Sequence, residues 1–103
     1  MIARVVEWAP TAAKEFDATI RYLKERSPQA ASQFADAVQE TIAGLARRNT
    51  GRPGRVEHTF EKSLPRYSQI IAFAYREGGV VLEVLHIIHT ARDWPAGVWP
   101  ADE

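Results

Sequence analysis

The chain has 103 residues, which is enough for one small domain and too few for two. Its hydrophobic content of 46% and charged content of 25% are typical of a globular protein and exclude a wholly disordered chain. Lys plus Arg and Asp plus Glu number 13 each, so the net charge is zero. No overall field attracts the protein to nucleic acid or membranes. We therefore expect a single domain over residues 1–103, an irregular tail from about residue 95, and no stable nucleic-acid binding by the chain alone.

The chain contains no cysteine, which excludes disulfides, thiolate zinc sites and cysteine nucleophiles. The N-terminal residues lack the charged and apolar pattern of a signal peptide. No stretch reaches the roughly 18 consecutive apolar residues of a membrane span. These features predict a cytoplasmic protein without membrane association.

Residues 4–8 are mostly β-branched or aromatic and predict a short strand. Pro10 then ends the strand and suits the first turn of a helix. The following segment carries apolar residues at helical spacing, which predicts an amphipathic helix. These residues are Ala12, Ala13, Phe16, Ile20 and Leu23.

Ser27 and Pro28 predict the end of that helix and the start of another, since serine suits the N-cap and proline the next position. The second helix should end near Arg48, where a basic side chain is favourable. So short a break predicts an antiparallel helical hairpin. Its apolar stripe consists of Ala31, Phe34, Ala35, Val38, Ile42 and Leu45.

Residues 49–55 have the composition of a loop, and Pro53 with Gly54 fits the centre of a type II turn. A half-exposed strand should follow and end before Pro65. Residues 68–75 predict a more buried strand.

Residues 77–79 predict a hairpin turn, and residues 80–89 a covered, central strand that is apolar on both faces. The predicted order is therefore β-α-α-β-β-β. This order indicates an α+β fold, with the helical hairpin packed on one face of a mostly antiparallel sheet and the opposite face partly open.

One candidate site is a basic cluster made of Arg47, Arg48, Arg52 and Arg55, with no acidic residue between Thr41 and Val56. The predicted turn would bring the Cα atoms of Arg52 and Arg55 within about 7 Å. Two guanidinium groups so placed could bind a phosphate or a carboxylate. The alternative is a solvated loop. The cluster lacks the Gly-Lys-Ser/Thr ending of a nucleotide-binding loop.

A second candidate lies at the end of the last strand and includes His86, His89, Arg92, Asp93 and Trp94. A histidine there could act as an acid or base near neutral pH. His86 and His89 are three positions apart, so on a strand they face opposite sides and make a poor metal site. We expect packing for His86, a position at the rim for His89, and neither a metal nor another cofactor.

In sequence the chain resembles the ParE branch of the RelE/ParE toxin superfamily, also known as plasmid-stabilisation proteins. The resemblance covers about residues 3–95. It rests on four segments in order, of which the last is the strongest and ends in the family's pattern of histidine, a small residue, alanine, arginine and aspartate. The segments are residues 12–23, 51–55, 64–67 and 83–94.

The resemblance implies the toxin of a type II toxin-antitoxin system, neutralised by a cognate antitoxin that is ParD-like or another DNA-binding protein. ParE toxins bind DNA gyrase and trap its cleaved-DNA state. The protein would then inhibit an enzyme without being one, and no catalytic residue is expected. Arginine and tryptophan dominate interface energies. The target-binding candidates are Arg52, Arg55, His89, Arg92 and Trp94.

Two alternatives stay open. RelE relatives cleave mRNA in the ribosome, and that chemistry would use His89 as the acid, Glu61 as the base, and Arg55 or Arg92 as phosphate clamps. Lys62, Arg66 and Tyr67 could then face the substrate backbone. However, no predicted strand is rich in lysine and residues 68–75 contain no arginine, and both absences disfavour RNA cleavage. The other alternative is an inactive module that only binds an antitoxin.

Overall fold

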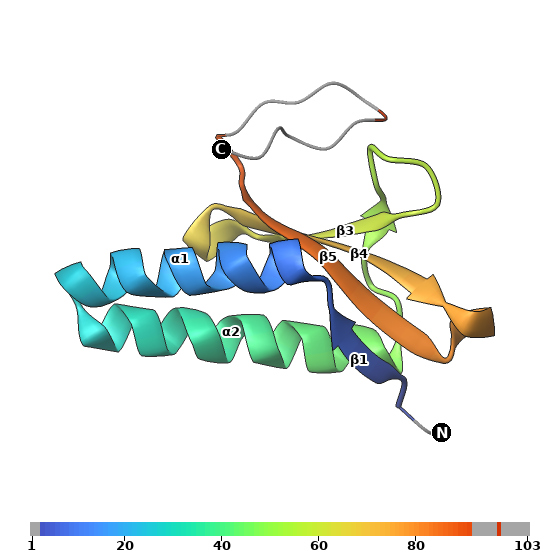
Figure 1. Ribbon diagram of the computed structural model, residues 1–103, viewed down its shortest axis with the longest axis horizontal. Helices are drawn as coiled ribbons and strands as arrows, with labels where there is room; N and C mark the ends of the chain where they lie inside the picture. Colours follow the sequence, from blue (N-terminus) through green and yellow to red (C-terminus); the bar gives the residue numbers. More distant parts are fainter. Residues whose placement is uncertain (1–2, 92–96, 98–103) are drawn as a thin grey trace.

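The computed structural model describes residues 3–91 and Gly97. Figure 1 shows the two helices lying side by side across one face of a sheet, which confirms the predicted α+β fold. The sheet has the strand order β1-β5-β4-β3-β2. The elements are β1 (Val5–Trp8), α1 (Pro10–Arg26), α2 (Pro28–Arg47), β2 (Arg52–Pro53), β3 (Phe60–Leu64), the 3-10 turn η1 (Pro65–Tyr67), β4 (Gln69–Arg76), the 3-10 turn η2 (Glu77–Gly79) and β5 (Val81–His89).

The sheet places the first strand of the chain beside the last. β1 pairs in parallel with β5, in the register Val5 with Val81. β4 pairs antiparallel with both β5 and β3 and lies at the centre of the sheet. The first six residues of β4 are all buried, which agrees with the predicted buried strand. β5 pairs with a strand on each side, as its apolar sequence predicted.

The helical hairpin forms where the sequence indicated. Ser27 ends α1 and caps α2, and its hydroxyl accepts a hydrogen bond of 3.1 Å from the backbone N–H of Ala30. Ala9 occupies the N-cap of α1 without a side-chain hydrogen bond, so the proline that follows it supplies the main local start signal. Phe34 and Leu45 of α2 are fully buried against the sheet.

Arg4 and Tyr75 join the N-terminus to the end of α2 and to η2. Arg4 Nε donates to the carbonyl of Gly79 at 2.6 Å, and its guanidinium lies 4.3 Å from the centre of the Tyr75 ring. The Tyr75 hydroxyl donates to the carbonyl of Leu45 at 2.9 Å. Burial raises the pKa of Tyr75, while the charge of Arg4 acts in the opposite direction.

The predicted type II turn at Pro53 and Gly54 is wrong. Pro53 belongs to β2 and pairs with Phe60 of β3, and Gly54 does not have the positive φ that such a turn requires. The chain reverses later, through His58 at φ 65°. Gly51 is needed for close packing, since a Cβ there would lie 2.8 Å from the ring of Phe73. Packing across the sheet, and not the Pro-Gly pair, sets the course of this loop.

The sheet face opposite the helices is less open than the sequence suggested. Ile70 and Ile88 are both buried and form a second small hydrophobic cluster, separate from the main core. The face that was expected to be partly open is therefore closed at these two positions. Among residues 3–91 no helix is long and apolar enough to cross a membrane.

Candidate partner-binding site

Arg52 and Arg55 meet at one buried carboxylate. Glu61 is 2% exposed and accepts a hydrogen bond of 2.8 Å from the backbone N–H of Arg55. The Arg52 guanidinium donates to the same carboxylate at 3.3 Å, while its side chain remains 59% exposed. The sequence expected the two arginines to come together, and they do so around Glu61 instead of in a tight turn.

This arrangement gives Glu61 a structural function in the loop before β3. Its carboxylate is enclosed and occupied by two donors, whereas a general base must reach the proton that it abstracts. The two cationic side chains of β3 and β4 are engaged as well. Lys62 donates to the carbonyl of Thr50 at 3.2 Å, and Arg76 pairs with Glu83 at 2.8 Å.

His86 and His89 differ in the way that their spacing predicted. His86 is largely buried, and its Nδ1 lies 3.3 Å from the carboxylate of Glu15 on α1. The same carboxylate accepts a hydrogen bond of 3.0 Å from the backbone N–H of Ile87. The pairing of β1 with β5 ends at Val84, so Glu15 provides an acceptor for a backbone N–H of β5 that has no partner on β1. His89 is exposed at the end of β5, and its Nδ1 accepts from the N–H of Ala91 at 3.0 Å.

Two target-binding candidates, Arg92 and Trp94, lie outside the described residues. The chain on either side of them is placed at two points. His89 ends β5, and further along the N–H of Gly97 donates to the carbonyl of Arg55 at 2.7 Å.

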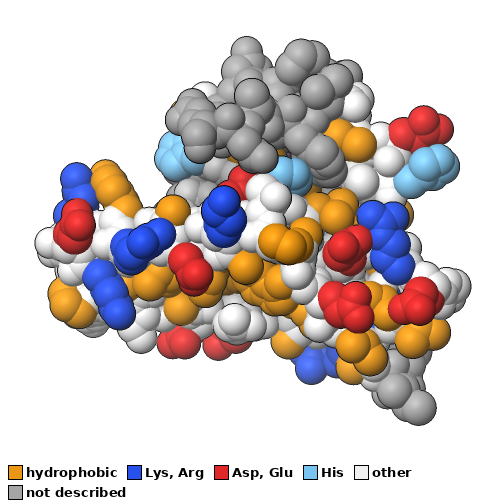
Figure 2. All heavy atoms as spheres, in the orientation of Figure 1, with side chains coloured by type: hydrophobic (Ala, Val, Ile, Leu, Met, Phe, Trp, Pro, Cys, Tyr) orange, Lys and Arg blue, Asp and Glu red, His pale blue; other side chains and the backbone are white. Residues whose placement is uncertain are grey.

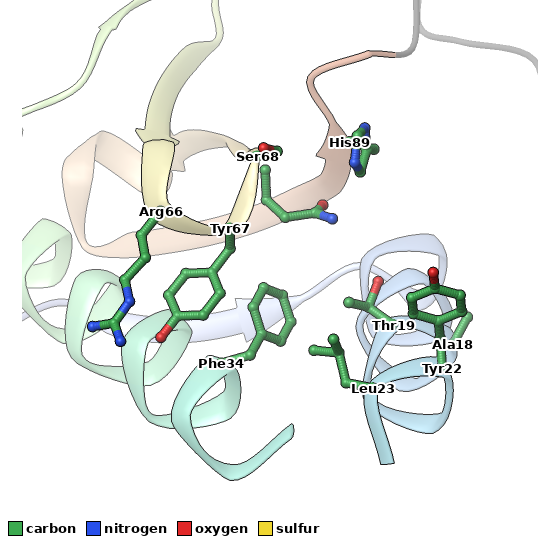
Figure 3. Close-up of a pocket in the computed structure, with 10 residues that line it drawn as sticks. Ala18, Thr19, Tyr22, Leu23, Phe34, Arg66, Tyr67, Ser68 and His89 are labelled. Carbon is green, nitrogen blue, oxygen red and sulfur yellow. The ribbon is translucent and has the colours of Figure 1, made fainter. Parts of the chain in front are cut away.

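A cavity of about 590 Å³ opens between the helical hairpin and the end of the sheet. Figure 3 shows its labelled side chains converging from α1, α2, η1 and β5. The ring of Tyr67 packs edge-on against that of Phe34, with 5.3 Å between centroids. The lining residues are Ala18, Thr19, Tyr22, Leu23, Phe34, Arg66, Tyr67, Ser68, Gln69 and His89.

Among the described residues that line the cavity none carries a carboxylate, while Arg66 and His89 can both donate hydrogen bonds to an anion. Elsewhere on the helical face, Figure 2 shows Lys and Arg side chains interspersed with Asp and Glu. No three His, Cys, Asp or Glu side chains among the described residues are grouped so that they could hold a metal ion. The cavity therefore suits a ligand with an apolar part and an acidic part.

Sequence reasoning identified His89 in this cavity and missed Gln69, Tyr22 and Phe34. Gln69 carried a usable signal, because it is a lone carboxamide that opens an otherwise apolar strand. Tyr22 and Phe34 gave none, since they fit the expected pattern of two amphipathic helices.

The fold is that of known toxins from toxin-antitoxin systems. It resembles a solved chain of the chromosomal ParDE system from P. aeruginosa, with a TM-score of 0.72 and 22% sequence identity, over 84% of this chain and 96% of that one. It also resembles a chain of the RelBE2 toxin-antitoxin complex from Mycobacterium tuberculosis, with a TM-score of 0.57 and 18% identity, over 85% of this chain and 99% of that one.

The sequence comparisons identify the family. Residues 6–94 match the model of the ParE toxin of the type II toxin-antitoxin system parDE. "Putative toxin Y4kP" of Sinorhizobium fredii is 26% identical over 96 residues, which cover 92% of this chain and 97% of that protein. The chain belongs to the ParE toxin family.

Proposed function

We propose that this ParE-family toxin poisons DNA gyrase and is neutralised by a cognate antitoxin in the cytoplasm. The observation that carries the proposal is the family match over residues 6–94. The chain would act by binding its target and not by catalysis. Arg52, Arg55, His89, Arg92 and Trp94 are the proposed contacts with gyrase.

The state of the cationic side chains favours gyrase over RNA cleavage. Cleaving a phosphodiester requires several positive groups that converge on one phosphate. Lys62 and Arg76 on the described strands are held by Thr50 and Glu83, and the buried Glu61 is held by Arg52 and the backbone of Arg55. The carboxylate that a RelE-type mechanism would use as its base is thus already occupied.

Supercoiled plasmid DNA incubated with purified gyrase, ATP and the toxin tests the proposed target. Poisoning should accumulate linear DNA that is covalently linked to gyrase and released by protease digestion. Adding the antitoxin before the toxin should abolish this product. Ribosome-dependent cleavage of mRNA without linear DNA would favour the RelE alternative, and neither activity from a folded chain would favour an inactive antitoxin-binding module.

The antitoxin partnership has its own test. An antitoxin segment that folds on binding could cover apolar surface at the groove of the helical hairpin. Co-expression with the antitoxin should therefore increase the amount of soluble toxin and restore growth. A lone chain that is freely soluble and harmless in cells would contradict the proposed partnership.

A further inference from the structure

The side-chain amide of Gln69 is buried and, among the residues that the structure describes, makes no hydrogen bond that would explain its place in the fold. Gln69 is 6% exposed and lines the cavity. Alternation along β4 places its side chain on the same face as Ile71, which belongs to the core under the helices. No side chain or backbone group in the described part of the chain forms a hydrogen bond with this carboxamide.

A buried amide without partners opposes folding, because it loses its hydrogen bonds to water and gains none in return. Such groups are uncommon in folded proteins and call for an explanation. The amide lies where an external group could reach it, since the cavity opens between η1 and α1. A ligand bound in the cavity would supply the hydrogen bonds that the Gln69 amide lacks within the described chain.

The surroundings of Gln69 define the chemistry of that ligand. Phe34 and Leu23 give the cavity an apolar wall, and the guanidinium of Arg66 lies at its edge, beyond the ring of Tyr67 (Figure 3). Tyr22 lies at the outer rim, with 55% of its surface exposed and the guanidinium of Arg26 3.8 Å from the centre of its ring. An occupant that fills the cavity and also covers Tyr22 must extend beyond an enclosed pocket, as a polypeptide segment does and a small molecule does not.

We propose that the cavity receives an apolar side chain of the antitoxin, that a polar group next to this side chain hydrogen-bonds to Gln69, and that an acidic residue of the same segment pairs with Arg66. This inference rests on the proposed antitoxin partnership and adds the anchor and its chemistry. Gln69 then determines specificity, since a partner without the matching polar group would leave the amide unsatisfied.

Substituting Gln69→Met tests the proposal, because methionine keeps the length of the side chain and removes the amide. The full-length variant and the wild-type chain are each titrated with the purified cognate antitoxin, and their thermal unfolding is followed without antitoxin. Gln69→Met should weaken antitoxin binding at least tenfold, while the free variant melts at the same or a higher temperature. Gln39→Met on the exposed face of α2 is the matched control and should change neither quantity.

A second variant tests the charge. Arg66→Glu places a carboxylate among described lining residues that carry none and should also weaken antitoxin binding at least tenfold. Antitoxin binding to Gln69→Met with wild-type affinity would overturn the inference, as would a clear fall in the melting temperature of that free variant. A wild-type dimer in sedimentation that Gln69→Met dissociates would also overturn it by assigning the cavity to a second copy. A wild-type chain that binds no antitoxin would refute the partnership itself.

Discussion

The carboxylate of Glu61 should contribute more to folding than any exposed ion pair of this protein. We consider the substitution Glu61→Gln, which preserves shape and removes the charge. The bond from the Arg55 N–H is charge-assisted, and such bonds contribute about 1.5–3 kcal/mol, compared with about 0.5–1.5 kcal/mol for neutral ones. The new amide would also place its NH₂ group, which is a donor, against either the Arg52 guanidinium or the Arg55 N–H, which are donors too. We expect a loss of about 2 kcal/mol in the free energy of unfolding.

In a domain of this size, about 1 kcal/mol shifts the melting temperature by roughly 4–8 °C, so Glu61→Gln should lower it by about 8–16 °C. Arg52→Ala is the matched control. It removes an ion-pair partner that is 59% exposed, and such pairs contribute at most about 1 kcal/mol. Thermal unfolding by circular dichroism measures both variants. Equal shifts for the two, or a shift of less than about 2 °C for Glu61→Gln, would refute this account of the loop.

Three further predictions concern activity and titration. His89→Ala should leave mRNA intact, as the wild type does, and ribosome-dependent cleavage that this substitution abolishes would reverse our view of the target. Arg92→Ala or Trp94→Ala should weaken gyrase poisoning at least tenfold, about 1.4 kcal/mol, with less effect on antitoxin binding; a large fall in melting temperature for Trp94→Ala would mark that residue as structural. Tyr75 should ionise above the usual pH of about 10, so stability that is complete below pH 10 should fall as the pH rises further. Absorbance at alkaline pH should show a tyrosine hydroxyl that ionises at a higher pH than usual, and Tyr75→Phe should remove this transition.

The helices and strands could be predicted because local signals and tertiary packing agree there. Ser27 and Pro28 determine where one helix ends and the next begins, and the apolar stripe of α2 is the surface that becomes buried. The register of β1 against β5 could not be predicted, since the paired residues Val5 and Val81 are far apart in the sequence.

The loop before β3 shows the opposite case. Pro53 and Gly54 form a local turn signal, yet Pro53 pairs with Phe60 and the chain turns later. A buried carboxylate from β3 and a close approach of Gly51 to Phe73 outweigh the local preference. Predicting this outcome requires knowing that Glu61 faces inward, and no periodicity in residues 49–64 reveals it.

The cavity depends on the packing of the hairpin against the sheet, which the sequence does not specify. Gln69 and His89 are paired across β4 and β5, although twenty positions separate them in the sequence. Their neighbours in the cavity come from both helices and from η1. Of the lining residues, the sequence singled out His89, Arg66 and Tyr67 and missed Gln69, whose burial depends on this packing.

The position of the cavity connects neutralisation with poisoning. His89 lines the cavity and is itself one of the proposed gyrase contacts. An antitoxin anchored at Gln69, which pairs with His89 across β4 and β5, would therefore lie at the start of the segment, from His89 onward, that we propose contacts gyrase. The antitoxin would neutralise the toxin by covering this segment, and would need no conformational change in the sheet. It follows that gyrase and antitoxin should compete for the toxin. Because Gln69→Met weakens only antitoxin binding, this variant should be harder to neutralise than the wild type without being less toxic.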